Sequence, residues 1–435
     1  MQVSEFDPQM ISAPAPLAMS PKGGPIGLLL TGGGARAAYQ AGVLEGVAEV
    51  RRTAGVREVG SPFAIVTGTS AGAINAAAIA SHADDFDHAT RCLAGIWRRV
   101  RPEEVYRAGA LPLSENGGGW RTAFSVARWL RHWRKRQPRS LLDNSPLAES
   151  LRRDVPLERL PMLMAAGYLQ ALAISASNYS SGEHYTFYQS SRRTSPWQRT
   201  QRVAVPTRIT HEHLLASSAI PFVFPASGIA MPDGHVEYFG DGSMRQTVPL
   251  ADAVHLGSER ILAIGSHRMT EPQGALNPNA LAGYPTLAQV AGHVMSSVFL
   301  DALSSDVERM QHINHALAHV PPAILAEMDI RPVKLLVISP SERVDVIASR
   351  HTSALPSALQ RMLGCSHEST KRETAQASAL ASYLLFDSGF TQELMALGRA
   401  DALRQRDAIQ AFFGWGRDVP IPSSREMEPG RAAGG

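Results

Sequence analysis

Cysteine is nearly absent from this 435-residue chain, which holds only Cys92 and Cys365. Two cysteines cannot build a disulfide framework, and their separation fits no CxxC motif. We expect both to be small, buried apolar residues. No set of histidine, cysteine and aspartate residues shows metal-ligand spacing along the sequence, so we predict no metal and no other cofactor.

An excess of one charge and a long apolar run are missing as well. Lys and Arg number 42 against 39 Asp and Glu, and a net charge of +3 gives no reason to expect a nucleic-acid partner. No stretch of about 18 residues is free of polar interruption, which argues against a spanning helix. Glu5 and Asp7 lie in a start that lacks the apolar core of a signal peptide. We therefore expect a cytoplasmic protein, or one that reaches a membrane only at its surface.

The chain is nevertheless rich in the material of a folded core. Hydrophobic residues make up 44% and charged residues 19%, which excludes intrinsic disorder as the main state. The length suits two to four domains, or one large α/β domain with an appendage. Residues 1–23 are rich in Pro, Ala and Ser, and we expect them to form a disordered tail. Residues 419–435 are rich in Pro, Gly and Ala, and we expect a loose tail there as well.

Strand and helix patterns alternate near the start. Residues 26–30 are an apolar run that predicts a buried strand, and glycines separate it from a helical pattern over 35–50. A second strand at 63–66 precedes a small-residue helix at 73–80. Such alternation predicts a largely parallel sheet covered on both faces.

Further along the chain the pattern predicts one more helix, four more strands and a helical C-terminal region. These are a helix at 85–107, strands at 169–175, 183–188, 261–265 and 334–338, and mainly helix from 341 to about 413.

The second strand leads into Gly68-Thr69-Ser70-Ala71-Gly72, a GxSxG pattern. A sharp strand-to-helix turn exposes the serine hydroxyl, and glycines on both sides relieve backbone crowding. The following helix directs its N-terminal dipole at developing negative charge. Ser70 is therefore our candidate nucleophile, with a structural serine in a tight turn as the alternative.

The glycine run Gly32-Gly33-Gly34 lies upstream of the serine. Consecutive glycines can turn several N–H groups toward one point, as an oxyanion hole requires. The run with Ala37 also fits a dinucleotide fingerprint, but the next strand ends in Thr67-Gly68-Thr69, without the acid that would hold a ribose. A purely structural turn is the remaining alternative.

Two charged residues complete the candidate set. Arg36 follows the glycines and could pair with a buried carboxylate or meet a lipid phosphate. Asp241 lies in the glycine-flanked Phe239-Gly240-Asp241-Gly242-Ser243, although an aspartate before glycine is by itself a common turn.

A basic segment, residues 120–139, carries seven Lys and Arg residues and no acid, with three interleaved tryptophans. Arginines attract anionic headgroups while tryptophan favours the membrane interface. We expect either peripheral contact with an anionic membrane or a solvated basic face whose tryptophans pack inward.

Three segments in order, LLLTGGGARAAYQAGVL, GTSAG and GDGSMR, give residues 24–345 a resemblance to the patatin-like phospholipase family. LLASSAIPFVFP at 214–225 is also similar to the segment that precedes the family's aspartate. The resemblance implies a three-layer α/β fold with a mostly parallel central sheet, followed here by a helical C-terminal region at 346–418. It also implies a Ser–Asp dyad that cleaves acyl esters of lipids without a histidine.

Carried over to this sequence, the resemblance makes Ser70 the nucleophile, Asp241 the general base, and Gly32, Gly33 and Gly34 the source of oxyanion N–H groups. Two positions depart from the family pattern, which usually has glycine at Ala37 and alanine or glycine at Ser243.

The expected function is thus hydrolysis of a phospholipid or another acyl lipid by a serine esterase. The alternatives are a His-dependent α/β-hydrolase or acyltransferase, and a catalytically idle lipid-binding protein. The sequence does not exclude a histidine base, and the catalytic region contains His82, His88, His184, His235 and His255.

Overall fold

The computed structural model describes residues 24–108, 140–231, 233–269, 302–328, 330–357, 359–360 and 380–415. The basic segment 120–139, the predicted tails 1–23 and 419–435, and Cys365 lie outside the described residues.

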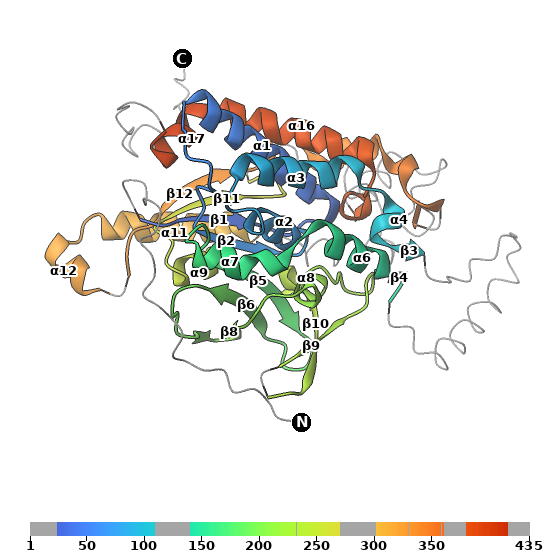
Figure 1. Ribbon diagram of the computed structural model, residues 1–435, viewed down its shortest axis with the longest axis horizontal. Helices are drawn as coiled ribbons and strands as arrows, with labels where there is room; N and C mark the ends of the chain where they lie inside the picture. The colour runs from blue at the N-terminus through green and yellow to red at the C-terminus, as the bar shows by residue number, and fades with distance from the viewer. Residues whose placement is uncertain are drawn as a thin grey trace, which may run out of the picture.

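The described chain folds around one mixed sheet of ten strands (Figure 1). The main path runs β12-β11-β1-β2-β5-β6-β8-β7, and β10 pairs with both β5 and β9. The strands are β1 Ile26–Leu30, β2 Ile65–Thr69, β5 Ala171–Asn178, β6 His184–Ser190, β7 Gln198–Arg199, β8 Arg202–Pro206, β9 Ser227–Ala230, β10 Val236–Asp241, β11 Arg260–Ile264 and β12 Lys334–Ile338. Strands β12, β11, β1, β2 and β5 run parallel to one another, and β5 pairs antiparallel with β6 and β10. A separate pair is formed by β3 Arg107–Ala108 and β4 Leu142–Asp143.

Helices and short 3-10 turns connect the strands. The α-helices are α1 Ala38–Thr53, α2 Ala71–Ala80, α3 Phe86–Arg99, α4 Pro102–Val105, α6 Ser145–Asp154, α7 Leu160–Ala165, α8 His211–Ser217, α9 Leu250–His255, α11 Leu303–Leu317, α12 Pro322–Glu327, α13 Val344–Ser349, α16 Ser388–Arg404 and α17 Arg406–Phe413. The 3-10 turns are η1 Gly34–Ala37, η2 Leu157–Arg159, η3 Gly242–Met244 and η5 Thr352–Ala354. In the part of the chain that the structure describes, none of these helices has the length and apolarity needed to cross a membrane.

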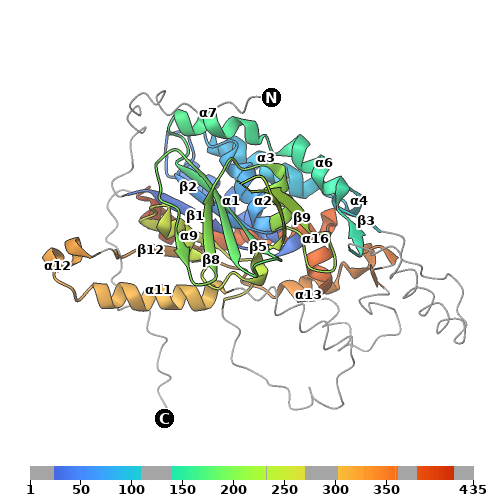
Figure 2. The same cartoon turned by 90° about the horizontal axis from the view of Figure 1, so that it is seen from below.

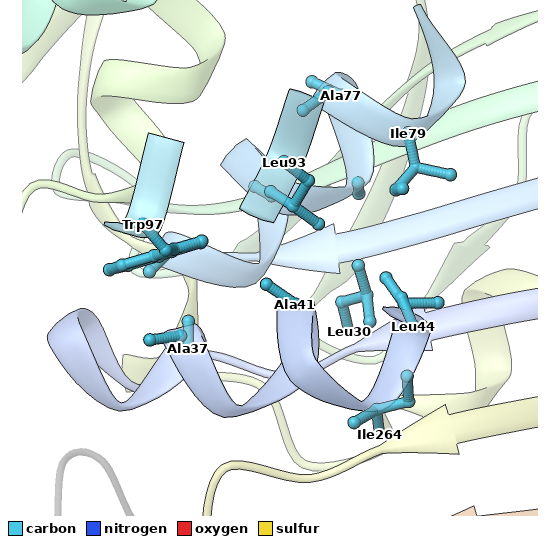
Figure 3. Close-up of a cluster of buried hydrophobic side chains, with 14 of the residues drawn as sticks. Leu30, Ala37, Ala41, Leu44, Ala77, Ile79, Leu93, Trp97 and Ile264 are labelled. Atoms are coloured by element: carbon cyan, nitrogen blue, oxygen red, sulfur yellow. The ribbon is translucent and has the colours of Figure 1, made fainter. Parts of the chain in front are cut away.

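The layers follow from the alternation of side chains along β1. Leu28 and Leu30 join the larger core with α1, α2 and α3, whereas Leu29 joins a smaller core with Leu250 of α9 and Leu303 of α11. Successive side chains of a strand point to opposite faces, so a strand with apolar residues throughout must be covered on both sides. Figure 3 shows the larger core, and Figure 2 shows α9 near β1 with α11 beside it. The predicted three-layer α/β architecture is confirmed.

The C-terminal helix α16 packs along α1, as Figure 1 shows. Glycines permit the close approach, because a Cβ at Gly42 would overlap the Met395 carbonyl and one at Gly398 would overlap the Tyr39 carbonyl. The Tyr39 hydroxyl also donates to Asp401 Oδ2 at 2.9 Å. The larger hydrophobic core therefore includes residues of α1, α2 and α3 together with residues of α16 and α17.

Strand β5 brings two distant segments together at one edge. Thr69, the last residue of β2, pairs with Ser175, and Asp241, the last residue of β10, pairs with Ala176. Strand β6 pairs with the opposite edge of β5. Strands β2 and β10 therefore pair with the same edge of β5, one after the other along its length. The residue after β2 is Ser70, so the sheet itself sets Ser70 beside Asp241.

The predicted strands lie within a few residues of the observed ones, but the helix expected over 85–107 is wrong in its second half. The expected helix is split into two: α3 ends at Arg99, and the short helix α4 begins at Pro102. The residue before a proline is disfavoured in the helical region, and Arg101 is extended.

Candidate active site

Ser70 lies in the sharp turn between β2 and α2. Its backbone has φ 56° and ψ −130°, a positive φ that is rare outside glycine. The crowding is real on both sides, because a Cβ at Gly68 would overlap the Gly72 carbonyl and one at Gly72 would overlap the Leu30 carbonyl. Strain of this kind at an overdetermined turn is characteristic of a nucleophile elbow.

The Ser70 hydroxyl faces the carboxylate of Asp241. Ser70 Oγ donates to Asp241 Oδ2 at 2.6 Å, and both residues are buried. The other oxygen, Oδ1, accepts the backbone N–H of Ser243 at 2.8 Å. One carboxylate oxygen is thus held by the turn that follows β10, while the other remains directed at the serine.

Burial raises the pKa of Asp241 to about 6, although hydrogen bonds from Ser70 and Ser243 oppose the rise. Removing a carboxylate from water disfavours its charged form, so the group becomes a stronger base than an exposed aspartate. It remains largely ionised at neutral pH, which suits acceptance of a proton from a serine hydroxyl.

Ser217 and Ser243 support the pair, and our sequence interpretation assigned a role to neither. The Ser70 N–H donates to Ser217 Oγ at 2.8 Å, and that hydroxyl donates to the Ser175 carbonyl at 2.6 Å. These two hydrogen bonds hold the turn at Ser70 against β5. Ser217 belongs to the LLASSAIPFVFP segment noted in the sequence, and that was the available signal.

The glycine run follows β1 and lies against the elbow. A Cβ at Gly32 would meet the Ser243 hydroxyl and the Ser70 Cβ. Gly34 has φ +54°, a backbone conformation that favours glycine. Among the described residues, the N–H groups of Gly33 and Gly34 donate to no other backbone group. Gly34 also lines a pocket together with Ser70. These two N–H groups thus have no backbone acceptor within the described part of the chain, and Gly34 lies in the same pocket wall as Ser70.

The far side of this loop is covered by the segment before α16. A Cβ at Gly34 would overlap the carbonyl oxygen of Tyr383. Arg36 Nε donates to Ser382 Oγ at 2.7 Å, and its guanidinium lies 4.3 Å from the centre of the Tyr383 ring. Buried Arg36 thus ties the glycine loop to the C-terminal region.

A mostly apolar pocket opens at Ser70 and encloses about 800 Å³ of space outside the atoms, part of it open to solvent. Helices α2, α3 and α6 and the segment after α8 supply its walls. The apolar lining comprises Ala71, Ile74, Ile96, Trp97, Val100, Val105, Leu147, Leu151, Val155, Ile220, Phe224 and Phe386.

Four charged residues also line the pocket, and they pair with one another. Arg99 and Arg153 each contact Asp154 at 2.8 Å, and Arg153 lies 3.7 Å from Glu104. Their charges are compensated within this group, so they do not make the lining a site for a free ion. The apolar surface suits a hydrocarbon chain.

A family model described as patatin-like phospholipase matches residues 28–254, just over half of the chain. This chain belongs to the patatin-like phospholipase family. Residues 28–254 contain the glycine run, the elbow and Asp241.

Other comparisons add little to this assignment. The crystal structure of VipD from Legionella pneumophila is similar over 86% of this chain and 67% of that one, at 13% identity and a TM-score of 0.28. A comparison with curated proteins found no significant match.

The two departures from the patatin-like pattern are accommodated locally. Ala37 is fully buried, ends the η1 turn and has φ −65°, which any L-residue adopts. The Ser243 backbone N–H donates to Asp241 Oδ1 at 2.8 Å, and the Ser243 side chain lowers the pKa of Asp241, which an alanine or glycine side chain would not do.

The five histidines left open by the sequence lie away from the serine hydroxyl. His184 is buried near Gly242, and burial lowers its pKa to about 4. His235 contacts Asp233 and Glu237, and His255 lies against Trp197. His82 and His88 contact each other. In the described part of the chain, the side-chain hydrogen bond of Ser70 Oγ is to Asp241 alone.

Proposed function

We propose that this patatin-like protein is a lipid acyl hydrolase in which Ser70 and Asp241 act as a catalytic dyad. The observation that carries the proposal is the 2.6 Å hydrogen bond between the two side chains, beside an apolar pocket that Ser70 helps to line. A strained elbow, a buried base and free backbone donors supply the three elements of serine acyl transfer.

In the acylation step, Ser70 Oγ attacks the ester carbonyl carbon while its proton passes to Asp241 Oδ2. The carbonyl oxygen becomes an oxyanion that accepts hydrogen bonds from the N–H groups of Gly33 and Gly34. The tetrahedral intermediate then breaks its bond to the alcohol oxygen, which leaves with the proton from Asp241. The products are an acyl-Ser70 ester and the free alcohol or lysolipid.

In the deacylation step, a water molecule takes the place of the leaving alcohol. Asp241 accepts its proton as the water oxygen attacks the acyl carbonyl, and the same glycine donors stabilise the second oxyanion. Collapse releases the carboxylic acid and returns the proton to Ser70 Oγ. The dyad is restored with no net change.

The acyl chain would occupy the apolar pocket beside Ser70. Its lining offers no uncompensated charge, because Arg99, Arg153, Asp154 and Glu104 pair among themselves. Burial of apolar surface contributes about 0.8 kcal/mol per methylene group, which favours long chains over short ones.

The decisive experiment compares wild type with Ser70→Ala on a short-chain p-nitrophenyl ester and on a phospholipid. We expect loss of both activities in a variant that keeps its melting temperature within a few degrees. A serine-directed phosphonate should add its mass to the peptide that contains Ser70. Normal turnover by folded Ser70→Ala, or labelling at another serine, would contradict the assignment.

We also propose that the basic segment 120–139 brings the enzyme to anionic membranes. Its seven cationic residues support this, since each is worth about 1 kcal/mol near an anionic surface. Flotation with anionic vesicles should recover wild type at low salt and less at high salt. Equal recovery after charge reversal of Arg131, Arg134, Lys135 and Arg136 would exclude this contact.

A further inference from the structure

A second cluster of reactive side chains lies at the end of α2 opposite Ser70. His82, His88 and Cys92 each offer one nitrogen or sulfur atom, and these three atoms lie within 4.8 Å of one another. His88 and Cys92 are one turn apart on α3, while His82 follows α2. From the sequence we expected no metal, because no set of histidine, cysteine and aspartate residues shows metal-ligand spacing. Spacing along the chain does not reveal that His82, from a separate segment, lies beside His88 and Cys92.

We propose that His82, His88 and Cys92 bind Zn²⁺. One thiolate and two imidazoles form a borderline-soft donor set that suits zinc and not the oxygen-seeking Mg²⁺ or Ca²⁺. Three protein ligands leave a fourth tetrahedral position for water.

The distance between the His88 and Cys92 ligand atoms fits such a site. His88 Nε2 lies 3.3 Å from Cys92 Sγ. Tetrahedral bonds of about 2.0 Å to nitrogen and about 2.3 Å to sulfur place those two ligand atoms about 3.5 Å apart. The pair therefore needs only a small adjustment to hold one ion between them.

A hydrogen bond sets the tautomer of His82. Its Nδ1 lies 3.1 Å from the Ala78 carbonyl, which can only accept a hydrogen bond, so Nδ1 carries the proton and Nε2 keeps its lone pair. Zinc-bound histidines commonly donate their other N–H to a carbonyl in this way. His82 is largely buried whereas His88 is exposed, so an ion could enter from solvent and meet an oriented ligand.

The nearby carboxylates are engaged elsewhere. Asp85 Oδ1 accepts the His88 backbone N–H at 2.8 Å as the cap of α3, and Asp84 contacts Arg159 at 2.8 Å. The proposed site therefore uses no carboxylate from this turn. An ion there would join the end of α2, whose start carries Ser70, to α3, which supplies Ile96 and Trp97 to the pocket.

Co²⁺ provides a direct spectroscopic probe in untagged, full-length protein. Wild type and Cys365→Ser should both develop thiolate-to-Co²⁺ absorption and tetrahedral d–d bands, and Zn²⁺ should abolish them. Cys92→Ser should lose the thiolate band. His88→Gln should weaken binding by about tenfold to a hundredfold or more. The proposal is overturned if wild type shows no thiolate band, or if the band depends on Cys365.

Thiol chemistry gives an independent test in the Cys365→Ser variant, whose single remaining thiol is Cys92. Zn²⁺ should slow its reaction with Ellman's reagent at least about tenfold, because the metal occupies the sulfur lone pair. Adding His88→Gln should restore the rate. An unchanged rate with excess Zn²⁺ would identify the three side chains as a packing cluster only. Neither readout depends on esterase activity.

Discussion

In the proposed dyad Asp241 has to be both buried and charged, and these two demands oppose each other. Its folded-state pKa of about 6 lies above the 3.8 of an exposed aspartate. The folded protein therefore holds this proton more tightly than the unfolded chain does. The associated stabilisation is complete below about pH 3.8 and is lost as the pH rises through 6.

Asp241→Asn should consequently raise stability while it removes activity. Asparagine is neutral, and it can accept from the Ser243 N–H and donate to Ser70. A shift from 3.8 to about 6 sets an upper gain of about 3 kcal/mol above pH 7, shrinking toward zero near pH 4. Urea unfolding of both proteins at several pH values measures this difference in the free energy of unfolding. A variant less stable than wild type at pH 8 would contradict this account of the buried charge.

Ser243 offers a way to tune the same group. Wild-type activity should fall as the pH drops through about 6, because protonated Asp241 cannot accept the serine proton. Ser243→Ala removes a hydrogen bond that favours the carboxylate, so the acid limb of kcat/KM should move to higher pH.

The matched control is Ser177→Ala. The Ser177 hydroxyl donates at 2.9 Å to the Asp241 backbone carbonyl and not to its carboxylate. The acid limb of the kcat/KM profile of Ser177→Ala should lie at the same pH as that of wild type. Equal displacement in both variants would mean that the limb reports general loosening of β10.

At the scale of elements, α6 supplies a wall of the pocket through Leu147, Ser150 and Leu151. Leu147→Phe should narrow the space available to an acyl chain. We expect kcat/KM for long-chain esters to fall about tenfold, with short-chain esters little affected. Leu147→Met conserves volume and should leave the ratio of long- to short-chain rates near wild type.

The contact between α1 and α16 predicts opposite outcomes for two glycine-to-alanine changes. A Cβ at Gly398 would overlap the Tyr39 carbonyl, whereas one at Gly95 on α3 meets only the end of the Arg99 side chain at 3.5 Å. Gly398→Ala should destabilise by about 1–3 kcal/mol. Gly95→Ala should stabilise by about 0.5–1 kcal/mol, since alanine is the better helix former. Similar melting temperatures for the two variants would refute the close approach.

The sequence was informative where a function depends on local geometry. The elbow at Ser70 and the glycine run need particular residues at fixed spacing, and both could be named in advance. Strand β10 could not, because Val236 and Tyr238 are apolar but exposed and Gly240 interrupts the pattern. We expected Asp241 in a turn, and it is the last residue of that strand.

The contacts that support the site could not be predicted from the sequence, for another reason. Ser217 lies 147 positions from Ser70, and Ser382 lies 346 positions from Arg36. Such pairs arise from the path of the chain in space, which one sequence does not encode in any local pattern. The same applies to His82, although His88 and Cys92 at i and i+4 were a usable signal for two of the three residues of that cluster.

For the molecule as a whole, the C-terminal helices share the core of the catalytic region. A chain ended after residue 380 would lose Ser382, Tyr383 and α16, and so expose the α1 surface around Gly42. We expect such a truncated protein to be aggregated or partly unfolded and without esterase activity. Circular dichroism and gel filtration would reveal this. A soluble, active fragment would show that α16 is dispensable.

The glycine loop that we propose as the source of oxyanion donors rests against the Tyr383 carbonyl, far along the chain. During synthesis the N-terminal segments leave the ribosome first, and domains fold as units once their parts are available. Ser70 and Asp241 therefore emerge well before the segment that closes the site around them. With the proposed mechanism, a nascent chain that has not yet reached residues 382–404 would carry Ser70 and Asp241 without the segment that packs against the glycine loop, and hydrolysis would begin only after that segment has been made.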